Sequence, residues 1–296
     1  MREETIGGLT VRMTGGTDGH GGGAGPLVIL MHGFGAPGDD LVPLWSHLHA
    51  PHGTRFVFPV GPLSLAMGFG ESRAWWMLDL DRITKDRAAG RPRDLSQEVP
   101  KGLAEAREKV LALVHDLDRR GAGSAKMVLG GFSQGAMLAC DVALRSHRSL
   151  AGLVLLSGTL VAQREWEPLM PTRKGLKVLQ SHGSQDPLLP FGQAERLRDL
   201  LAGAGMVVDW VGFRGGHEIP EAILAKLGAF LRMVLAGRAG GGIQRCAGRA
   251  SRSPHWRWSF RCPGLSGRPR HKPLPSPASG TRPAIAKPPV RARALN

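Results

Sequence analysis

The sequence predicts an α/β fold in which helices cover both faces of a mostly parallel central sheet. Short apolar runs bounded by Gly or Pro, such as LVILM at 27–31, are typical of strands buried on both faces. These runs alternate with segments whose apolar residues recur at three- and four-residue steps, as between Leu103 and Leu117. Strands that alternate with helices indicate a parallel sheet, because each parallel connection needs a crossover.

The predicted elements follow one another from residue 9 to residue 235. Strands are expected near residues 9–13, 27–31, 55–60, 126–129, 152–156, 176–180 and 206–211. Helices are expected near residues 41–49, 100–121, 135–145, 192–201 and 220–235, and loops at residues 15–25 and 61–95. Asp39 or Asp40 is expected to cap the first helix, and Asp94 and Gln97 have the spacing of a capping box for the second.

The positive charge of the chain is concentrated at its C-terminal end. The formal net charge is +15, but 13 of the 39 Lys and Arg residues and none of the 24 Asp and Glu residues lie in 237–296. Residues 1–236 therefore hold 26 basic and 24 acidic residues and are nearly neutral. We expect a folded domain at 1–236 and a disordered, basic, Arg/Gly/Pro-rich tail at 237–296, which cannot bury enough apolar surface to fold.

The composition excludes several other classes of protein. The three cysteines, Cys140, Cys246 and Cys262, lack the spacing of a disulfide framework or a zinc site. The histidines that crowd residues 32–52 lack accompanying acidic or cysteine ligands, so we expect no metal and no cofactor. The N-terminus has no secretory signal pattern, and no apolar run approaches the ~18–20 residues of a membrane span. We expect a soluble cytoplasmic protein that is a monomer or homodimer.

The segment Gly131–Gly135 has the pattern G-x-S-x-G and makes Ser133 the candidate nucleophile. It lies directly after a predicted strand and directly before a predicted helix. A strand that reverses into a helix over so few residues needs small neighbours, and it presents the serine above the end of the sheet. The N–H groups at the start of the helix can stabilise an oxyanion. An incidental serine in a Gly-rich turn is the alternative, which the flanking strand and helix disfavour.

A serine nucleophile needs a base, and the base needs an acid to orient it. In folds with this strand-to-helix turn the acid and then the base follow the serine, each at the end of a later strand. Asp186 and His217 occupy those positions. His182 is an alternative base, but it precedes the candidate acid and would reverse the order. Glu218 adjoins the base and Asp209 lies within a strand, so both are weaker candidates for the acid.

The segment Met31–Gly35, MHGFG, follows the first buried strand and predicts the other half of an oxyanion hole. A loop of this kind supplies a backbone N–H to the oxyanion of the reaction. We assign the two donors as the N–H groups of Phe34 and Gln134. The chain contains no tyrosine, so a tyrosine hydroxyl cannot serve here.

These motifs together resemble the phospholipase/carboxylesterase family of α/β hydrolases, which includes acyl-protein thioesterases and small bacterial carboxylesterases. The resemblance spans about residues 27–235. It rests on MHGFG (31–35), AWW (74–76), GFSQGA (131–136), HGSQDPLLP (182–190) and GGHEIP (215–220). It implies an α/β-hydrolase fold, the triad Ser133–Asp186–His217, and an oxyanion hole at Phe34 and Gln134. The related dienelactone hydrolases have a cysteine nucleophile, which Ser133 disfavours.

The same resemblance places Trp75 and Trp76 beside the acyl-binding site, although packing in the core is an equal alternative for two adjacent tryptophans. It offers no counterpart for 237–296, and a readthrough or frameshifted C-terminus is one hypothesis for that tail. The short segment 157–175 between two predicted strands leaves no room for a large cap domain.

The predicted function is a serine hydrolase that cleaves carboxylic ester or thioester bonds through an acyl-enzyme. Its expected partner is a small-molecule ester or thioester with a small or medium acyl group, or a lysophospholipid-like substrate. One alternative is a nucleic-acid-binding protein that acts through the basic tail, with HWRW (255–258) stacking on bases, although no specific nucleic acid is expected. A peptidase or acyltransferase on the same fold is the other alternative.

Overall fold

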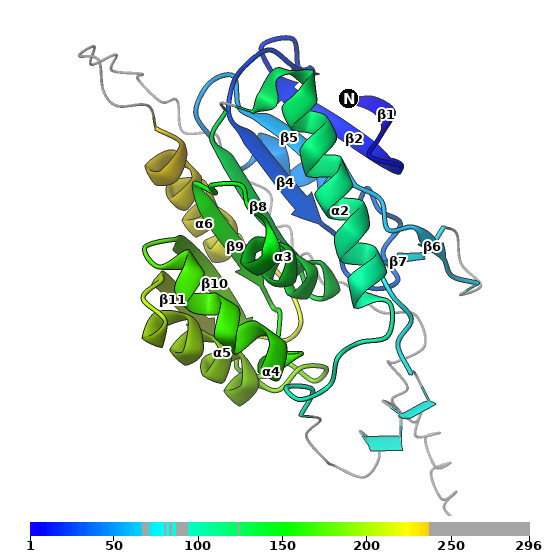
Figure 1. Cartoon of the computed structure of the whole chain (residues 1–296), viewed down its shortest axis with the longest axis vertical. Coiled ribbons are helices and arrows are strands. Elements are labelled where there is room, and N and C mark those ends of the chain that lie inside the picture. The colour runs from blue at the N-terminus through cyan, green and yellow to red at the C-terminus, as the bar shows by residue number, and fades with distance from the viewer. Residues whose placement is uncertain (67–70, 80, 83–84, 87–93, 124, 237–296) are drawn as a thin grey trace, which may run out of the picture. The chain divides into compact units, whose positions relative to one another are not determined.

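The computed structural model describes residues 1–66, 71–79, 81–82, 85–86, 94–123 and 125–236. The described residues form a nine-stranded sheet in the order β1-β2-β5-β4-β8-β9-β10-β11, with β3 beside β2 (Figure 1). Its strands are β1 (Arg2–Ile6), β2 (Leu9–Gly16), β3 (His20–Gly22), β4 (Leu27–Met31), β5 (Arg55–Pro59), β8 (Met127–Phe132), β9 (Gly152–Leu156), β10 (Lys177–Gly183) and β11 (Val207–Phe213). The pairs β1–β2 and β2–β5 are antiparallel, and the pairs from β5 through β4, β8, β9 and β10 to β11 are parallel. The predicted mostly parallel sheet is confirmed.

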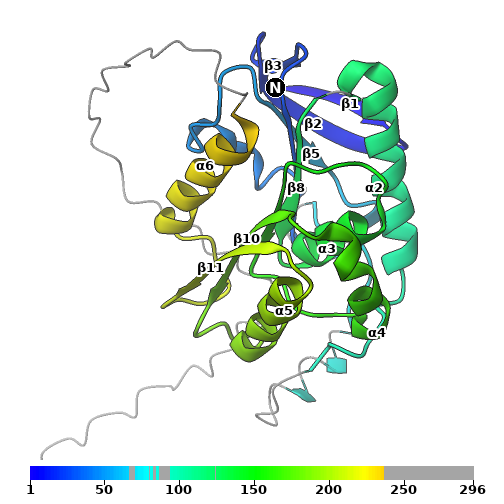
Figure 2. The ribbon, with the colours of Figure 1, turned by 60° about the vertical axis from the view of Figure 1, so that its left-hand side comes forward.

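Helices cover both faces of this sheet. They are α2 (Leu103–Leu117), α3 (Gln134–Arg145), α4 (Gln163–Trp166), α5 (Phe191–Gly203) and α6 (Glu221–Leu235), with 3-10 helices η1 (Val42–Ser46) and η3 (Glu167–Arg173) and a π-helical turn η2 (Asp118–Ala122). Figure 2 shows α6 on the opposite side of the sheet from α2 and α3. A separate hairpin pairs β6 (Leu63–Ser64) with β7 (Arg73–Ala74).

The side chains of β4 show why this strand is apolar throughout. Leu27, Ile29 and Met31 pack in the core that includes residues of α2, α3 and α5. Val28 and Leu30 pack in the second core, against residues of η1 and α6. Successive side chains of a strand point to opposite faces, so a strand between two helical layers has no polar face.

Several predicted boundaries were wrong. The residues 41–49 form only the short 3-10 helix η1, which contains Pro43 and has no side-chain cap. The helix α2 does not begin at the predicted capping box; its N-cap is Gly102, with a left-handed φ of 97°, and Asp94 instead accepts a hydrogen bond from the Ser96 N–H. Four strands were missed. They are β1, β3 in the predicted loop 15–25, and the short strands β6 and β7 in the predicted loop 61–95.

The predicted absence of a large cap domain between β9 and β10 is confirmed. The connecting residues form only α4 and η3, and these lie against the main core through Trp166 and Met170, which are buried. The predicted tail 237–296 and parts of the predicted loop 61–95 lie outside the described residues.

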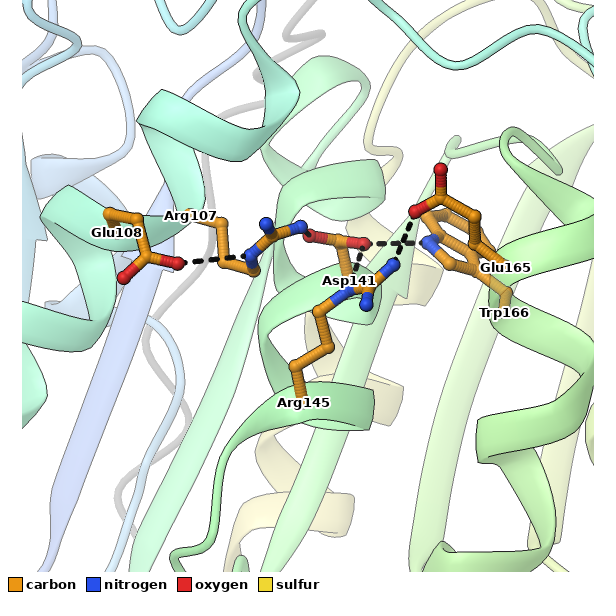
Figure 3. A network of polar contacts seen from close by, with 6 residues as sticks. All are labelled: Arg107, Glu108, Asp141, Arg145, Glu165 and Trp166. Carbon is orange, nitrogen blue, oxygen red and sulfur yellow. Dashed lines mark hydrogen bonds and ion pairs between the residues drawn. The ribbon is translucent and has the colours of Figure 1, made fainter.

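A buried carboxylate joins the helices on one face of the sheet. Asp141 of α3 is fully buried and accepts hydrogen bonds from Arg107 Nη1 of α2 at 3.0 Å, Arg145 Nε at 3.2 Å and Trp166 Nε1 of α4 at 2.8 Å (Figure 3). Glu165 then binds the outer end of Arg145 near the surface. A buried charge is tolerated only when it is paired and hydrogen-bonded, so this network fixes how α2 and α4 pack on α3.

Candidate active site

Ser133 lies on the predicted sharp turn between β8 and α3. Its φ of 55° and ψ of −117° are strained for a residue with a side chain, and its N–H donates to Leu156 O at 2.8 Å. A Cβ at Gly131 would lie 2.6 Å from Met31 O, and one at Gly135 would lie 2.1 Å from the same oxygen. The two glycines of the motif are therefore required by the close approach of β4, as the sequence pattern predicts.

Asp186 and His217 come from loops that the backbone ties together. The loops follow the neighbouring parallel strands β10 and β11, so they leave the sheet at the same edge. Ser184 N–H donates to Phe213 O at 2.8 Å, and Gln185 N–H donates to Gly215 O at 2.9 Å. A Cβ at Gly183 would lie 2.2 Å from Gly216 O, so only glycine permits this approach.

The side chains of Asp186 and His217 form a short hydrogen bond. His217 Nδ1 lies 2.6 Å from Asp186 Oδ2, and the side chain of Asp186 is fully buried. Burial alone would raise the pKa of Asp186, but hydrogen bonds from His182, His217 and the Leu189 N–H together hold that pKa well below its usual range. The carboxylate therefore stays ionised and fixes the Nδ1–H tautomer of His217, which leaves Nε2 free to accept a proton.

His217 lies beside the turn that contains Ser133. Its ring centroid is 4.8 Å from that of Phe132, the residue directly before Ser133. In the described part of the chain Ser133 Oγ has no hydrogen-bond partner, and the contact between a serine and its base is often long before substrate binds. The structure thus brings the three predicted triad residues to one end of the sheet.

The predicted oxyanion loop also lies against Ser133. A Cβ at Gly33 would lie 3.4 Å from Ser133 Cβ, so the loop is in van der Waals contact with Ser133. Among the described residues, neither the Phe34 N–H nor the Gln134 N–H has a hydrogen-bond acceptor, whereas Gly35 N–H donates to Arg73 O. Two free N–H groups, one from the loop and one from the start of α3, are available to an oxyanion.

The profile of the phospholipase/carboxylesterase family matches residues 21–235, which is most of the chain. The chain belongs to this family. It is an enzyme, a serine hydrolase that cleaves ester or thioester bonds. The family assignment confirms the resemblance and the α/β-hydrolase fold that the motifs predict.

Known proteins are similar to this chain over most of their own length. The chain is 26% identical over 216 residues to acyl-protein thioesterase 1 of Gibberella zeae, covering 70% of this chain and 90% of the relative. It is 30% identical over 189 residues to acyl-protein thioesterase 1 of Mycosarcoma maydis, covering 59% of this chain and 74% of the relative. The crystal structure of esterase PE8 is 30% identical, with a TM-score of 0.62 over 77% of this chain and 99% of that one. Arabidopsis thaliana SOBER1, 21% identical with a TM-score of 0.57 over 72% of this chain and all of that one, shares the fold.

Trp75 and Trp76 lie in the core of this family member, and both are 2% exposed. The side chain of Gln134 holds them, because its Oε1 accepts from Trp75 N–H and its Nε2 donates to Trp76 O, both at 2.9 Å. Trp75 Nε1 in turn donates to His32 O at 3.0 Å. The segment is therefore hydrogen-bonded to the predicted oxyanion loop, a link that the sequence pattern does not reveal. The predicted contact of Trp75 and Trp76 with substrate stays a prediction.

His32 is held between two backbone groups. Its Nε2 accepts from Gly61 N–H at 2.8 Å, so Nδ1 carries the proton that goes to Gly33 O at 2.7 Å. Both nitrogens are occupied, and burial lowers the pKa of His32 to about 4.

Within the described residues no group of three or more His, Cys, Asp or Glu side chains could hold a metal ion. No helix in the same part of the chain has the length and apolar character needed to cross a bilayer.

We expect His32 to make the fold less stable in acid. The unfolded chain takes up a proton at His32 below about pH 6.5 and the folded chain only below about pH 4, so the stability that His32 provides falls by up to about 3 kcal/mol as pH drops through that window. His32→Gln should therefore destabilise the protein at pH 8 and much less at pH 4.

The measurement is the free energy of unfolding of both proteins by urea at each pH, with exposed His47→Gln as the control. Only the difference between proteins isolates His32, since burial raises the pKa of Asp40 to about 7 and its titration acts in the opposite direction. A difference that does not change with pH would contradict this assignment.

Proposed function

We propose that Ser133, His217 and Asp186 are the catalytic triad of this hydrolase. The observation that carries the proposal is the buried 2.6 Å contact between His217 Nδ1 and Asp186 Oδ2, beside the strained turn that presents Ser133. Ser133 alone is a weak nucleophile, and an oriented imidazole is the group that activates it.

In this mechanism Ser133 Oγ attacks the acyl carbon as its proton passes to His217 Nε2, and the carbonyl oxygen becomes an oxyanion. The Phe34 and Gln134 N–H groups bind that oxygen, and Asp186 stabilises the imidazolium. His217 then gives the proton to the departing alcohol or thiol, which leaves an acyl group on Ser133. A water molecule, deprotonated by His217, releases the carboxylic acid and restores the serine.

We propose esters and thioesters of small or medium acyl groups as substrates, including lysophospholipid-like molecules. The segment between β9 and β10 supports this range, since α4 and η3 pack on the core and provide no separate lid over Ser133. Thioesters are included because the fungal relatives are named acyl-protein thioesterases. In this proposal the domain is 1–236, and the tail 237–296 is not needed for turnover.

The test compares an oxyester and a thioester that carry the same acyl chain. Both should pass through one acyl-enzyme, so mass spectrometry of quenched enzyme should find the acyl mass on the peptide that contains Ser133 in each case. When deacylation limits the rate, the two substrates should share one kcat. Prior reaction with a fluorophosphonate should block both activities in equal proportion. Acylation of any other residue would contradict the proposal.

A further inference from the structure

His182 is a buried histidine that the triad does not use. It belongs to β10, its side chain is fully buried, and its ring packs edge-on against Phe191 at the start of α5, with centroids 6.1 Å apart. Its Nε2 lies 3.0 Å from Leu189 O and 3.3 Å from Asp186 Oδ2. Both neighbours of Nε2 are acceptors, so Nε2 carries the proton and the ring acts as a donor here.

The two neighbours of His182 are parts of one turn. Asp186 Oδ1 accepts the Leu188 N–H at 2.8 Å and the Leu189 N–H at 3.0 Å. Both backbone groups of Leu189 are therefore hydrogen-bonded. Its N–H donates to Asp186, and its carbonyl oxygen accepts from His182. His182 closes the turn around the carboxylate and places an N–H edge beside Oδ2, the oxygen that His217 also binds.

We infer that His182 is a positioning residue of the reaction, which holds the Asp186 carboxylate in the orientation that His217 needs. The inference rests on the proposed triad. Two backbone N–H groups occupy Oδ1 and two imidazoles face Oδ2, so the carboxylate cannot rotate away from His217 without breaking several of these contacts. Burying an ionised carboxylate is costly unless such donors surround it, and His182 is the donor that comes from the rigid sheet.

His182 also affects how readily His217 gives up its proton. The active enzyme has neutral His217 beside the Asp186 carboxylate, and protonation of His217 neutralises the pair. A donor on the carboxylate stabilises the active, negatively charged pair more than the protonated one. Glu218 is another titratable group on the His217 loop, and its Oε1 accepts the Gly216 N–H at 3.3 Å. Removing the His182 Nε2–H donor should therefore shift the acidic limb of the plot of kcat/KM against pH to higher pH.

The test uses His182→Leu, which keeps bulk but removes the donor, and His182→Gln, whose amide N–H₂ can reach the position of Nε2. For His182→Leu we expect kcat to fall about 10–100-fold, by analogy with the loss caused when a partner that orients a metal-bound histidine is removed. KM should change little, and the midpoint of the acidic limb should rise by about 0.5–1 pH unit. His182→Gln should restore most of kcat and the original midpoint.

Gln180→Leu is the matched control. Gln180 precedes His182 by two residues on the same strand and is buried, and its Nε2 donates to Ala194 O at 2.7 Å rather than to the Asp186 turn. The variant Gln180→Leu should lower the melting temperature as His182→Leu does, but it should leave the acidic limb of the kcat/KM profile at its original pH. If His182→Leu behaves like Gln180→Leu in the pH profile, or if His182→Gln is no better than His182→Leu, the inference is wrong.

A double-mutant cycle with Asp186→Asn separates this inference from the triad itself. If His182 acts through Asp186, His182→Leu should cause no further loss of kcat in the Asp186→Asn protein. Full activity of Asp186→Asn would overturn the proposed triad. A large loss in Asp186→Asn, together with full activity of His182→Leu, would overturn only the role of His182. Each protein is first shown to be folded by circular dichroism and thermal unfolding.

Discussion

Ser133→Ala is expected to lower kcat by about 10⁴–10⁶-fold while leaving the fold intact. The variant removes the only atom that forms the covalent bond and leaves the oxyanion donors, which sustain a small residual rate. The measurement is turnover of an activated ester by the untreated natural protein and by the Ser133→Ala protein. Only the Ser133→Ala protein is first treated with fluorophosphonate, which inactivates contaminating serine hydrolases. Ser184→Ala is the matched control, since Ser184 is an exposed serine of the Asp186 loop and should keep full activity.

The strained turn at Ser133 gives this prediction a second readout. A residue without Cβ tolerates a φ of 55°, so Ser133→Gly should be as inactive as Ser133→Ala but unfold with a free energy about 1 kcal/mol higher. An equal or lower stability of the glycine variant would show that the turn is not strained. Retained activity in either variant would end the assignment of the nucleophile.

Asp141→Ala is expected to destabilise the fold by about 3–5 kcal/mol, because it leaves Arg107 and Arg145 without their buried carboxylate. The Trp166 indole N–H would lose its acceptor as well. The measurement is urea unfolding followed by far-UV circular dichroism, from which the free energy of unfolding of each protein is obtained.

Glu165→Gln is the control for Asp141→Ala, because it removes an ion pair with the same Arg145 at a site where Glu165 is 45% exposed. Exposed pairs contribute about 0–1 kcal/mol, so this variant should unfold almost like the natural protein. A similar loss in both variants would mean that burial of Asp141 does not set the strength of the network.

The placement of Ser133, Asp186 and His217 at strand ends could be predicted because the proposed chemistry requires particular residue types there. Their roles stay a prediction. The glycines beside Ser133 are dictated by contact with β4, and that need is visible in the sequence as a G-x-S-x-G pattern. The buried strands were equally predictable, since a strand covered on both faces has to be apolar throughout.

The rest depends on contacts between distant segments. The hydrogen bonds of Gln134 to Trp75 and Trp76 join residues that are 59 and 58 positions apart, respectively, and no local pattern encodes them. The strand β1 was missed because its sequence, REETI, is charged and half-exposed at the edge of the sheet. The predicted capping box at Asp94 failed because Gly102, in a left-handed conformation, interrupts the approach to α2.

The proposed triad residues follow strands that differ in how many neighbouring strands they pair with. The nucleophile follows β8, which is paired on both sides, whereas the base follows β11, the last strand of the sheet and paired in the described structure with β10 alone. Terminal strands open at a lower free energy than central ones. Heating should therefore unfold β11 locally before the rest of the protein unfolds. Activity should then be lost reversibly at a temperature where the Ser133 turn and most of the fold remain native.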